Sequence, residues 1–152
     1  MRKYLLPLSG LAMLAAANGA FAASQTSNFN VKVTVNTACT VAATDLNFGT
    51  FTGSIPAGTT GSSTATVSCN KNTAYALSFV TGAGPLAAVG TTVVSMANGV
   101  NPPIPASLTV SATAQTATGG NDTTTINGTI SAAVPNPAVG TYSIAQAIYV
   151  LY

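Results

Sequence analysis

The sequence feature that most constrains the fold is an alternating stretch near the N-terminus, residues 29–35. Its apolar side chains alternate with polar ones, which is the period of two expected of a β-strand with one buried face. The stretch has no Gly or Pro and is rich in β-branched Val, which favours a strand. Such a strand must bury its apolar face, either in its own chain or in another. The apolar positions are Phe29, Val31, Val33 and Val35.

The residues before this strand have the pattern of a secretory signal peptide. Arg2 and Lys3 precede an apolar run over residues 5–17 and a small-x-small sequence at residues 20–22. The run is too short and too rich in Ala and Gly to span a bilayer comfortably. We therefore expect residues 1–22 to be cleaved on export.

Charge is nearly absent from the rest of the chain. The sequence has four Lys and Arg, two Asp and no Glu or His, and two of the cations lie in the signal peptide. Two remaining cations are too few to neutralise phosphates, which excludes a nucleic-acid binder. A near-neutral surface does little to keep copies apart, so the composition favours self-assembly. The charged residues after the signal peptide are Lys32, Asp45, Lys71 and Asp122.

Two cysteines, Cys39 and Cys69, remain in the exported chain. An oxidising compartment and an even count predict one disulfide between them. A closed loop of this length stabilises a fold by roughly 3 to 4 kcal/mol in the chain-entropy account. A metal site has no support, because the chain has no His and no further Cys.

The same inventory predicts that the protein is not an enzyme. General acid and base chemistry needs paired titratable groups, whereas Asp45 and Asp122 are far apart in sequence and each has a turn context. We expect both to cap turns. No Gly-rich loop opens a helix to cradle a phosphate, and no cofactor is expected.

Turn signals divide the chain into short strands. The clearest hairpin is predicted between residues 64–69 and the alternating Tyr75, Leu77 and Phe79, joined by a turn at residues 70–73. The last strand is expected to cover residues 142–152. No helical periodicity follows the signal peptide, so the fold class is all-β, a sandwich of six or seven strands of immunoglobulin type.

The middle of the chain predicts three further features. A short strand is expected over residues 91–96 and another from Leu108. The prolines in residues 102–105 predict a loop that a central strand would not tolerate. A strand over residues 123–134 is expected to be interrupted by a bulge or bend at residues 127–128, where Asn precedes Gly.

Four short blocks occur in a recognisable order. An alternating strand runs into Cys at residues 29–39, L-N-F-G occupies 46–49, T-A-T-V-S-C occupies 64–69, and G-T-Y opens a final strand ending in Tyr over 140–152. These blocks resemble the Spore Coat Protein U domain family, which includes the major pilins of archaic (Csu-type) chaperone-usher pili.

The resemblance implies an incomplete immunoglobulin-like β-sandwich that is completed by a donated N-terminal strand. The chain would then comprise the signal peptide 1–22, a donor-strand segment 23–38 and a pilin domain 39–152. The donor side chains would be those of Phe29, Val31, Val33 and Val35. They would fill a groove in the neighbouring copy, between its first strand and the strand ending at Tyr152. That last strand, where a chaperone would also dock, would present Tyr142, Ile144, Ile148, Val150 and Tyr152.

The function that the resemblance implies is that of a structural subunit of a surface pilus that serves adhesion and biofilm formation. Its partners would be identical or homologous pilin subunits, a periplasmic chaperone and an outer-membrane usher, with no nucleic acid and no small-molecule substrate. The protein would pass through the inner membrane to the periplasm and then reach the cell surface. A self-contained secreted coat or matrix protein, whose first strand pairs within its own chain, and a minor or tip adhesin subunit remain open.

Overall fold

The computed structural model describes residues 25–152, so the predicted signal peptide over residues 1–22 lies outside the described residues. The chain divides into two units between Thr34 and Val35. In the first unit, residues 25–34 have no regular secondary structure and their side chains are exposed. The second unit contains all the strands of the described part of the chain, the first of which begins at Cys39.

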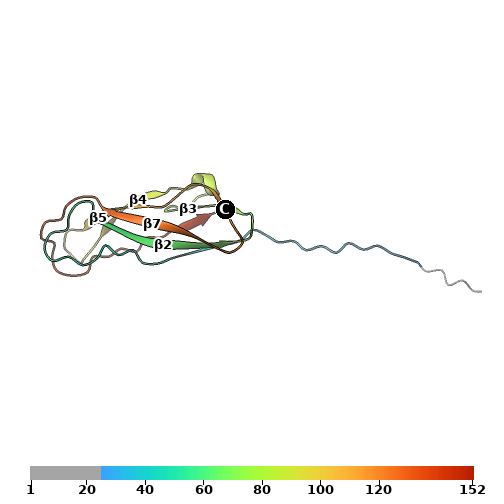
Figure 1. Ribbon diagram of the computed structural model, residues 1–152, viewed down its shortest axis with the longest axis horizontal. Coiled ribbons are helices and arrows are strands. Elements are labelled where there is room, and N and C mark those ends of the chain that lie inside the picture. Colours follow the sequence, from blue (N-terminus) through green and yellow to red (C-terminus); the bar gives the residue numbers. More distant parts are fainter. Residues whose placement is uncertain (1–24) are drawn as a thin grey trace, which may run out of the picture. The chain divides into compact units, whose positions relative to one another are not determined.

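The second unit consists of two antiparallel sheets. One has the strand order β1-β2-β7-β5-β4 and the other the order β6-β3-β8. Figure 1 shows β2 and β7, the two longest strands, side by side. This architecture confirms the all-β prediction and is consistent with an immunoglobulin-like sandwich. The elements are β1 Cys39–Ala43, β2 Thr60–Cys69, β3 Ala74–Ser78, the 3-10 turn η1 Pro85–Ala87, β4 Thr91–Met96, β5 Ile104–Thr109, β6 Gln115–Thr116, β7 Asn121–Ile130 and β8 Tyr149–Leu151.

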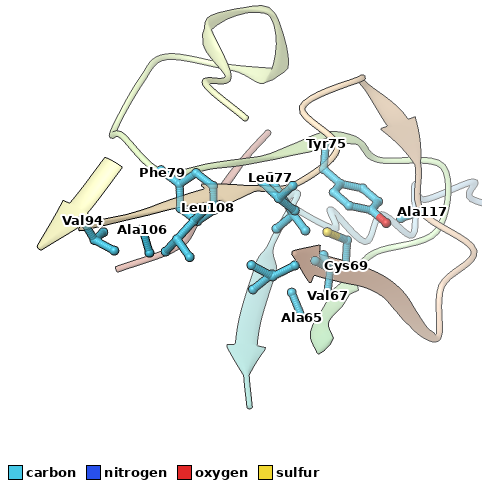
Figure 2. Close-up of a cluster of buried hydrophobic side chains, with 12 residues drawn as sticks. Ala65, Val67, Cys69, Tyr75, Leu77, Phe79, Val94, Ala106, Leu108 and Ala117 are labelled. Atoms are coloured by element: carbon cyan, nitrogen blue, oxygen red, sulfur yellow. The ribbon is translucent and has the colours of Figure 1, made fainter. Parts of the chain in front are cut away.

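The main core fills the space between the two sheets. Over residues 64–69 the predicted alternation is the alternation of buried side chains in the structure. Over residues 75–79, Tyr75, Leu77 and Phe79 belong to the main core as predicted, but Ala76 and Ser78 between them are buried as well. Figure 2 shows these side chains, with Phe79 beside Leu108 and the Tyr75 hydroxyl directed toward Ala117. The buried cluster comprises Ala65, Val67, Cys69, Tyr75, Leu77, Phe79, Val94, Ala106, Leu108, Val110, Ala117 and Ile126.

The predicted hairpin between β2 and β3 is wrong, although both strands and the turn exist. β2 pairs with β1 and β7, and β3 pairs with β6 and β8. The turn over residues 70–73, with Asn72 at a φ of 66°, therefore carries the chain from one sheet to the other. Both strands point apolar side chains into the same core from opposite sides, a pattern that alternation alone does not distinguish from a hairpin.

The predicted proline loop is wrong at its last two residues, because β5 begins at Ile104. Pro105 lies in β5, a central strand, and pairs with Ser95 of β4. The Pro105 carbonyl accepts a hydrogen bond from the backbone N of Ser131 at 3.3 Å, just past the end of β7. Since the N–H and C=O of a strand residue point to the same edge, the donor that Pro105 lacks would face this strand end and not β4.

The bulge predicted at residues 127–128 is also wrong. β7 pairs in unbroken register with β2 and β5 through Asn127 and Gly128. A Cβ on Gly128 would lie 2.8 Å from Cζ of Phe48 and 3.0 Å from a methyl carbon of Leu46. The glycine therefore makes room for two apolar side chains packed on the sheet.

The last strand is shorter than the predicted 142–152. β8 covers Tyr149–Leu151 and pairs only with β3 among the described residues. Before it, Ser143 forms an isolated bridge with Ala97, which follows β4. The chain thus leaves one sheet and joins the other, and residues 144–148 form no ladder on the way.

Candidate functional site

An open groove with a volume of about 650 Å³ lies along one side of the sandwich. Its first wall is the extended segment that continues β1, residues 43–48. Its second wall is the segment that leads into β8, residues 141–146 with Ile148. Its floor is formed by side chains of both sheets and is mostly apolar. The floor residues are Ser63, Phe79, Val94, Met96, Leu108 and Ile126.

The groove lies where two sheet edges meet. β1 is the outer strand of the five-stranded sheet and β8 is an outer strand of the three-stranded sheet. The two strands lie near each other at one end of the groove. At the other end, Phe48 and Tyr142 both pack against the small cluster of Ile55, Ile104 and Ile130. The walls therefore run in opposite directions, and each has backbone groups that a strand between them can pair with.

The first wall is held by a pair of glycines. Gly61 of β2 and Gly128 of β7 lie directly opposite each other in the ladder. A Cβ on either would lie 3.0 Å from a methyl carbon of Leu46, and a Cβ on Gly61 would lie 2.6 Å from the carbonyl oxygen of Asn47. Gly61 and Gly128 are the only inward-facing positions of β2 and β7 without a side chain, and the L-N-F-G block packs over them. Because of this space, Leu46 and Phe48 can lie close to the sheet and line the groove.

The second wall contains part of the side-chain set predicted for the last strand. Tyr142, Ile144 and Ile148 line the groove. Val150 packs against the main core beside it, and Tyr152 is half exposed and is not a lining residue. The lining also includes the odd-numbered Thr141, Ser143 and Ala145, and the buried residue of β8 is Leu151, so strict alternation does not extend through this segment. The floor residues were not predicted, whereas the spacing of Leu46 and Phe48 was a usable signal for the first wall.

The four apolar side chains of the N-terminal segment are largely exposed. Phe29, Val31, Val33 and Val35 are 84%, 84%, 88% and 73% exposed. An exposed apolar face of four side chains is typical of a surface that binds a partner. Two hydrogen bonds attach the chain at Ala38 to Asn70. The backbone N of Ala38 donates to Oδ1 of Asn70 at 2.7 Å, and the carbonyl of Ala38 accepts from the backbone N of Asn70 at 3.2 Å.

The predicted disulfide is confirmed and joins the edge strand β1 to the inner strand β2. Cys39 and Cys69 are bonded and are direct partners in the β1–β2 ladder. Cys69 is buried in the main core and Cys39 packs against it. The bridge thus anchors the start of β1, and with it the first wall of the groove, to the central strand β2.

The two carboxylates have different surroundings. Asp122 accepts hydrogen bonds from the backbone N of Thr118 at 3.2 Å and from the Thr118 hydroxyl at 2.7 Å, which confirms its predicted turn-capping role. Asp45 is exposed and lines the first wall of the groove. Asp122 is not among the groove residues, so the structure does not bring the two together in this site.

The fold changes the titration of Tyr75. Burial, followed by the nearby negative charge of Asp122, raises the pKa of the Tyr75 hydroxyl above its ordinary value. The hydroxyl donates to Oε1 of Gln115 at 3.2 Å. Tyr75 faces the main core and does not line the groove.

Two further properties of residues 25–152 bear on function. They contain no cluster of three or more His, Cys, Asp or Glu side chains that could hold a metal ion. No helix in this part of the chain has the length and apolar character needed to cross a membrane.

Comparison with known families gives one match. The sequence profile of the Spore Coat Protein U domain matches residues 25–145, which include the N-terminal segment, the first wall of the groove and the second wall as far as Ala145. No curated protein matches the chain significantly.

Proposed function

The chain belongs to the Spore Coat Protein U domain family, and from this membership we propose that it is a structural subunit of a chaperone-usher surface pilus. In this proposal, residues 29–35 of one copy enter the groove of the next, and repetition of that exchange builds the fibre. The fibre serves adhesion and biofilm formation. The protein acts as a building element and carries out no catalysis.

The observation that carries the proposal is the presence, in one chain, of an apolar groove and an unburied apolar segment. The groove has two walls with edge backbone groups and a floor of core side chains. The segment offers four apolar side chains on alternate residues. An extended peptide that adds to a sheet edge obtains its affinity from the backbone ladder and its specificity from alternate side-chain pockets.

The dimensions of the two parts agree. Residues 29–35 in a strand span roughly 20 to 24 Å at about 3.3 Å per residue, and the six residues 43–48 of the first wall span a similar length. Each apolar side chain that becomes buried contributes about 1.5 to 3 kcal/mol. A strand between the walls also pairs with both sheet edges at once, which closes the sandwich.

The remaining parts of the chain have roles in assembly. Residues 1–22 direct export to the periplasm and are removed, residues 23–38 are the donor segment, and residues 39–152 form the receiving domain. A periplasmic chaperone covers the groove until an outer-membrane usher exchanges it for the donor segment of the next subunit. Tyr142, Ile144 and Ile148 of the second wall, with Val150 and Tyr152, form the surface on which the chaperone docks.

The test replaces two donor side chains. Val31→Asp combined with Val33→Asp puts two carboxylates where the groove floor is apolar, and unpaired buried charges are strongly unfavourable. Polymer on the cell surface should be lost while chaperone-bound monomer remains in the periplasm. The matched control, Ser27→Asp with Asn28→Asp, adds the same charge just outside the donor face and should assemble normally. Normal polymer from the double Val variant would refute the donor assignment.

A further inference from the structure

Each of the two parts of the proposed joint carries one of the few charged side chains of the chain. Residues 25–152 contain only two cations and two anions. Lys32 lies in the middle of the donor segment, and Asp45 lies in the first wall of the groove. Asp122 is held by Thr118, and Lys71 packs beside Gly119, outside the groove. Each side of the joint therefore brings one charge, and the two charges are opposite.

Both charged side chains are on the face that points away from the floor. Lys32 alternates with Val31 and Val33, so a donor whose valines point inward presents Lys32 outward. Asp45 directly precedes Leu46, whose side chain packs inward over Gly61 and Gly128. Neighbouring strands place side chains of the same face about 4.5 to 5.5 Å apart at Cβ when their residues are opposite.

The two charged residues lie at the middle of the donor segment and at the middle of the first wall. Lys32 is the central residue of 29–35, and Asp45 and Leu46 are the two central residues of the wall 43–48. A donor centred on the wall therefore brings Lys32 next to Asp45 in either strand direction. The long Lys side chain covers the remaining offset.

We propose that Lys32 of the donated strand pairs with Asp45 of the receiving copy and that this pair sets the register of the joint. The inference rests on the proposed function. A slip by one residue would turn the apolar face outward, which the pattern itself prevents. A slip by two residues keeps the apolar face inward and exchanges one Val for another at two positions, because Val31, Val33 and Val35 are identical. Among the apolar side chains, only Phe29 then distinguishes the two registers. The charge pair adds a second distinction.

The pair contributes specificity more than strength. An exposed ion pair adds little to affinity and is screened by salt. A chain with almost no other charge has few competing contacts, so one opposite pair at the joint guides alignment effectively. The apolar side chains and the backbone ladder hold the strand once the register is chosen.

The test is cysteine cross-linking between two co-expressed variants in the producing cells. Lys32→Cys on one copy and Asp45→Cys on the other should give a disulfide-linked dimer in the polymer that boiling does not separate and a reductant does. The controls replace Asn30 or Thr34 by Cys in place of Lys32, since a two-residue slip would bring one of these opposite Asp45. At the predicted register their Cα atoms are too far from residue 45 for a disulfide.

The outcomes separate this inference from the proposed function. A predominant Lys32→Cys cross-link supports the pairing. A predominant cross-link from the Asn30 or Thr34 position overturns the register and leaves strand donation intact. Polymer that contains both variants but forms no cross-link at any position overturns the placement of the donor beside residues 43–48. Normal polymer from the Val31 and Val33 aspartate variant overturns the proposed function itself.

Charge exchange gives a second readout if the cysteine variants assemble poorly. Lys32→Asp places two carboxylates together, and Asp45→Lys places two ammonium groups together, so each should lower the yield of surface polymer by about fivefold at low salt. The double exchange should restore the yield. A double variant no better than the weaker single variant would overturn the pairing.

Discussion

Gly61 and Gly128 face each other across the β2–β7 ladder, and the Leu46 side chain lies over both. Neither glycine has a positive φ, so their role is to leave space and not to permit a turn. The first wall of the groove therefore exists because two facing strands lack a side chain at the same level. The stability of this wall depends on both positions remaining small.

Replacing Gly61 by Ala should destabilise the fold by about 1 to 3 kcal/mol, because the new Cβ would lie 2.6 Å from the Asn47 carbonyl oxygen, a backbone atom that moves only with the wall. Gly120→Ala is the matched control, since its nearest neighbour would be the Thr118 hydroxyl at 3.8 Å. The control should change stability by less than about 0.5 kcal/mol. Denaturant unfolding of both variants measures the difference, and equal midpoints would contradict the packing argument.

Removing the Cys39–Cys69 bridge should cost roughly 3 to 4 kcal/mol, because the bond closes a loop with a sequence separation of 30 residues. The double variant Cys39→Ala with Cys69→Ala tests this by denaturant unfolding. Wild-type protein treated with a reductant serves as a comparison that keeps both side chains. An unchanged midpoint in both would show that the ladder holds β1 without the bond.

Alkaline pH should destabilise the fold through Tyr75. Burial, with the charge of Asp122 second, raises the pKa of this hydroxyl in the folded state. The folded protein thus keeps the proton at pH values where the unfolded chain releases it. The contribution to stability is complete below about pH 10, the unfolded pKa, and is lost as the pH rises through the folded pKa. Tyr75→Phe should show a flatter fall in unfolding free energy above pH 10, and parallel profiles would contradict this assignment.

Ile144→Asp should reduce polymer formation without unfolding the domain. Its side chain lines the second wall yet is 51% exposed, so a charge there is tolerated by the monomer and opposed by an apolar strand in the groove. Val139→Asp is the matched control because Val139 is 100% exposed and is not a lining residue. The fraction of protein in a ladder that resists SDS and collapses on boiling measures assembly, and equal fractions would argue against the groove as the binding site.

The same gel distinguishes a pilus subunit from a self-contained coat or matrix protein. A pilus subunit should run as an SDS-resistant ladder because each joint is a complete strand within a folded sandwich. A self-contained coat or matrix protein should run as a compact monomer before and after boiling. A monomer from surface-extracted material would therefore contradict polymerisation by strand donation.

Local sequence patterns predicted the individual strands better than their pairing. The alternation over residues 64–69 and 75–79 correctly identified inward side chains, because the period of two belongs to each strand alone. The neighbour of each strand in a sheet depends instead on contacts between residues that are distant in sequence. β2 and β3 are therefore neighbours in the chain and belong to opposite sheets.

Glycine and proline were misinterpreted for a related reason. Gly128 predicted a bulge and Pro105 predicted a loop, because both residue types weaken an isolated strand. In the fold, Gly128 accommodates Phe48 and Leu46 from a distant segment, and Pro105 lies at a level where β7 has ended. The resemblance to the family, and not alternation, placed the groove between the first strand and the strand ending at Tyr152. The contact of Leu46 with Gly61 and Gly128 was not predicted, because nothing local to Leu46 indicates the two glycines beneath it.

The bonds around Ala38 determine how a fibre of such subunits would carry tension. Only residues 36–38 separate Val35 from Cys39, so a pull on a donated strand reaches β1 at its first residue. There the disulfide passes the load directly to Cys69, at the end of β2, which is paired along its length with β7. β1 is thereby protected from being peeled away one hydrogen bond at a time. The mechanical strength of the joint would then be limited by the ladder at the groove and not by the covalently braced strand behind it.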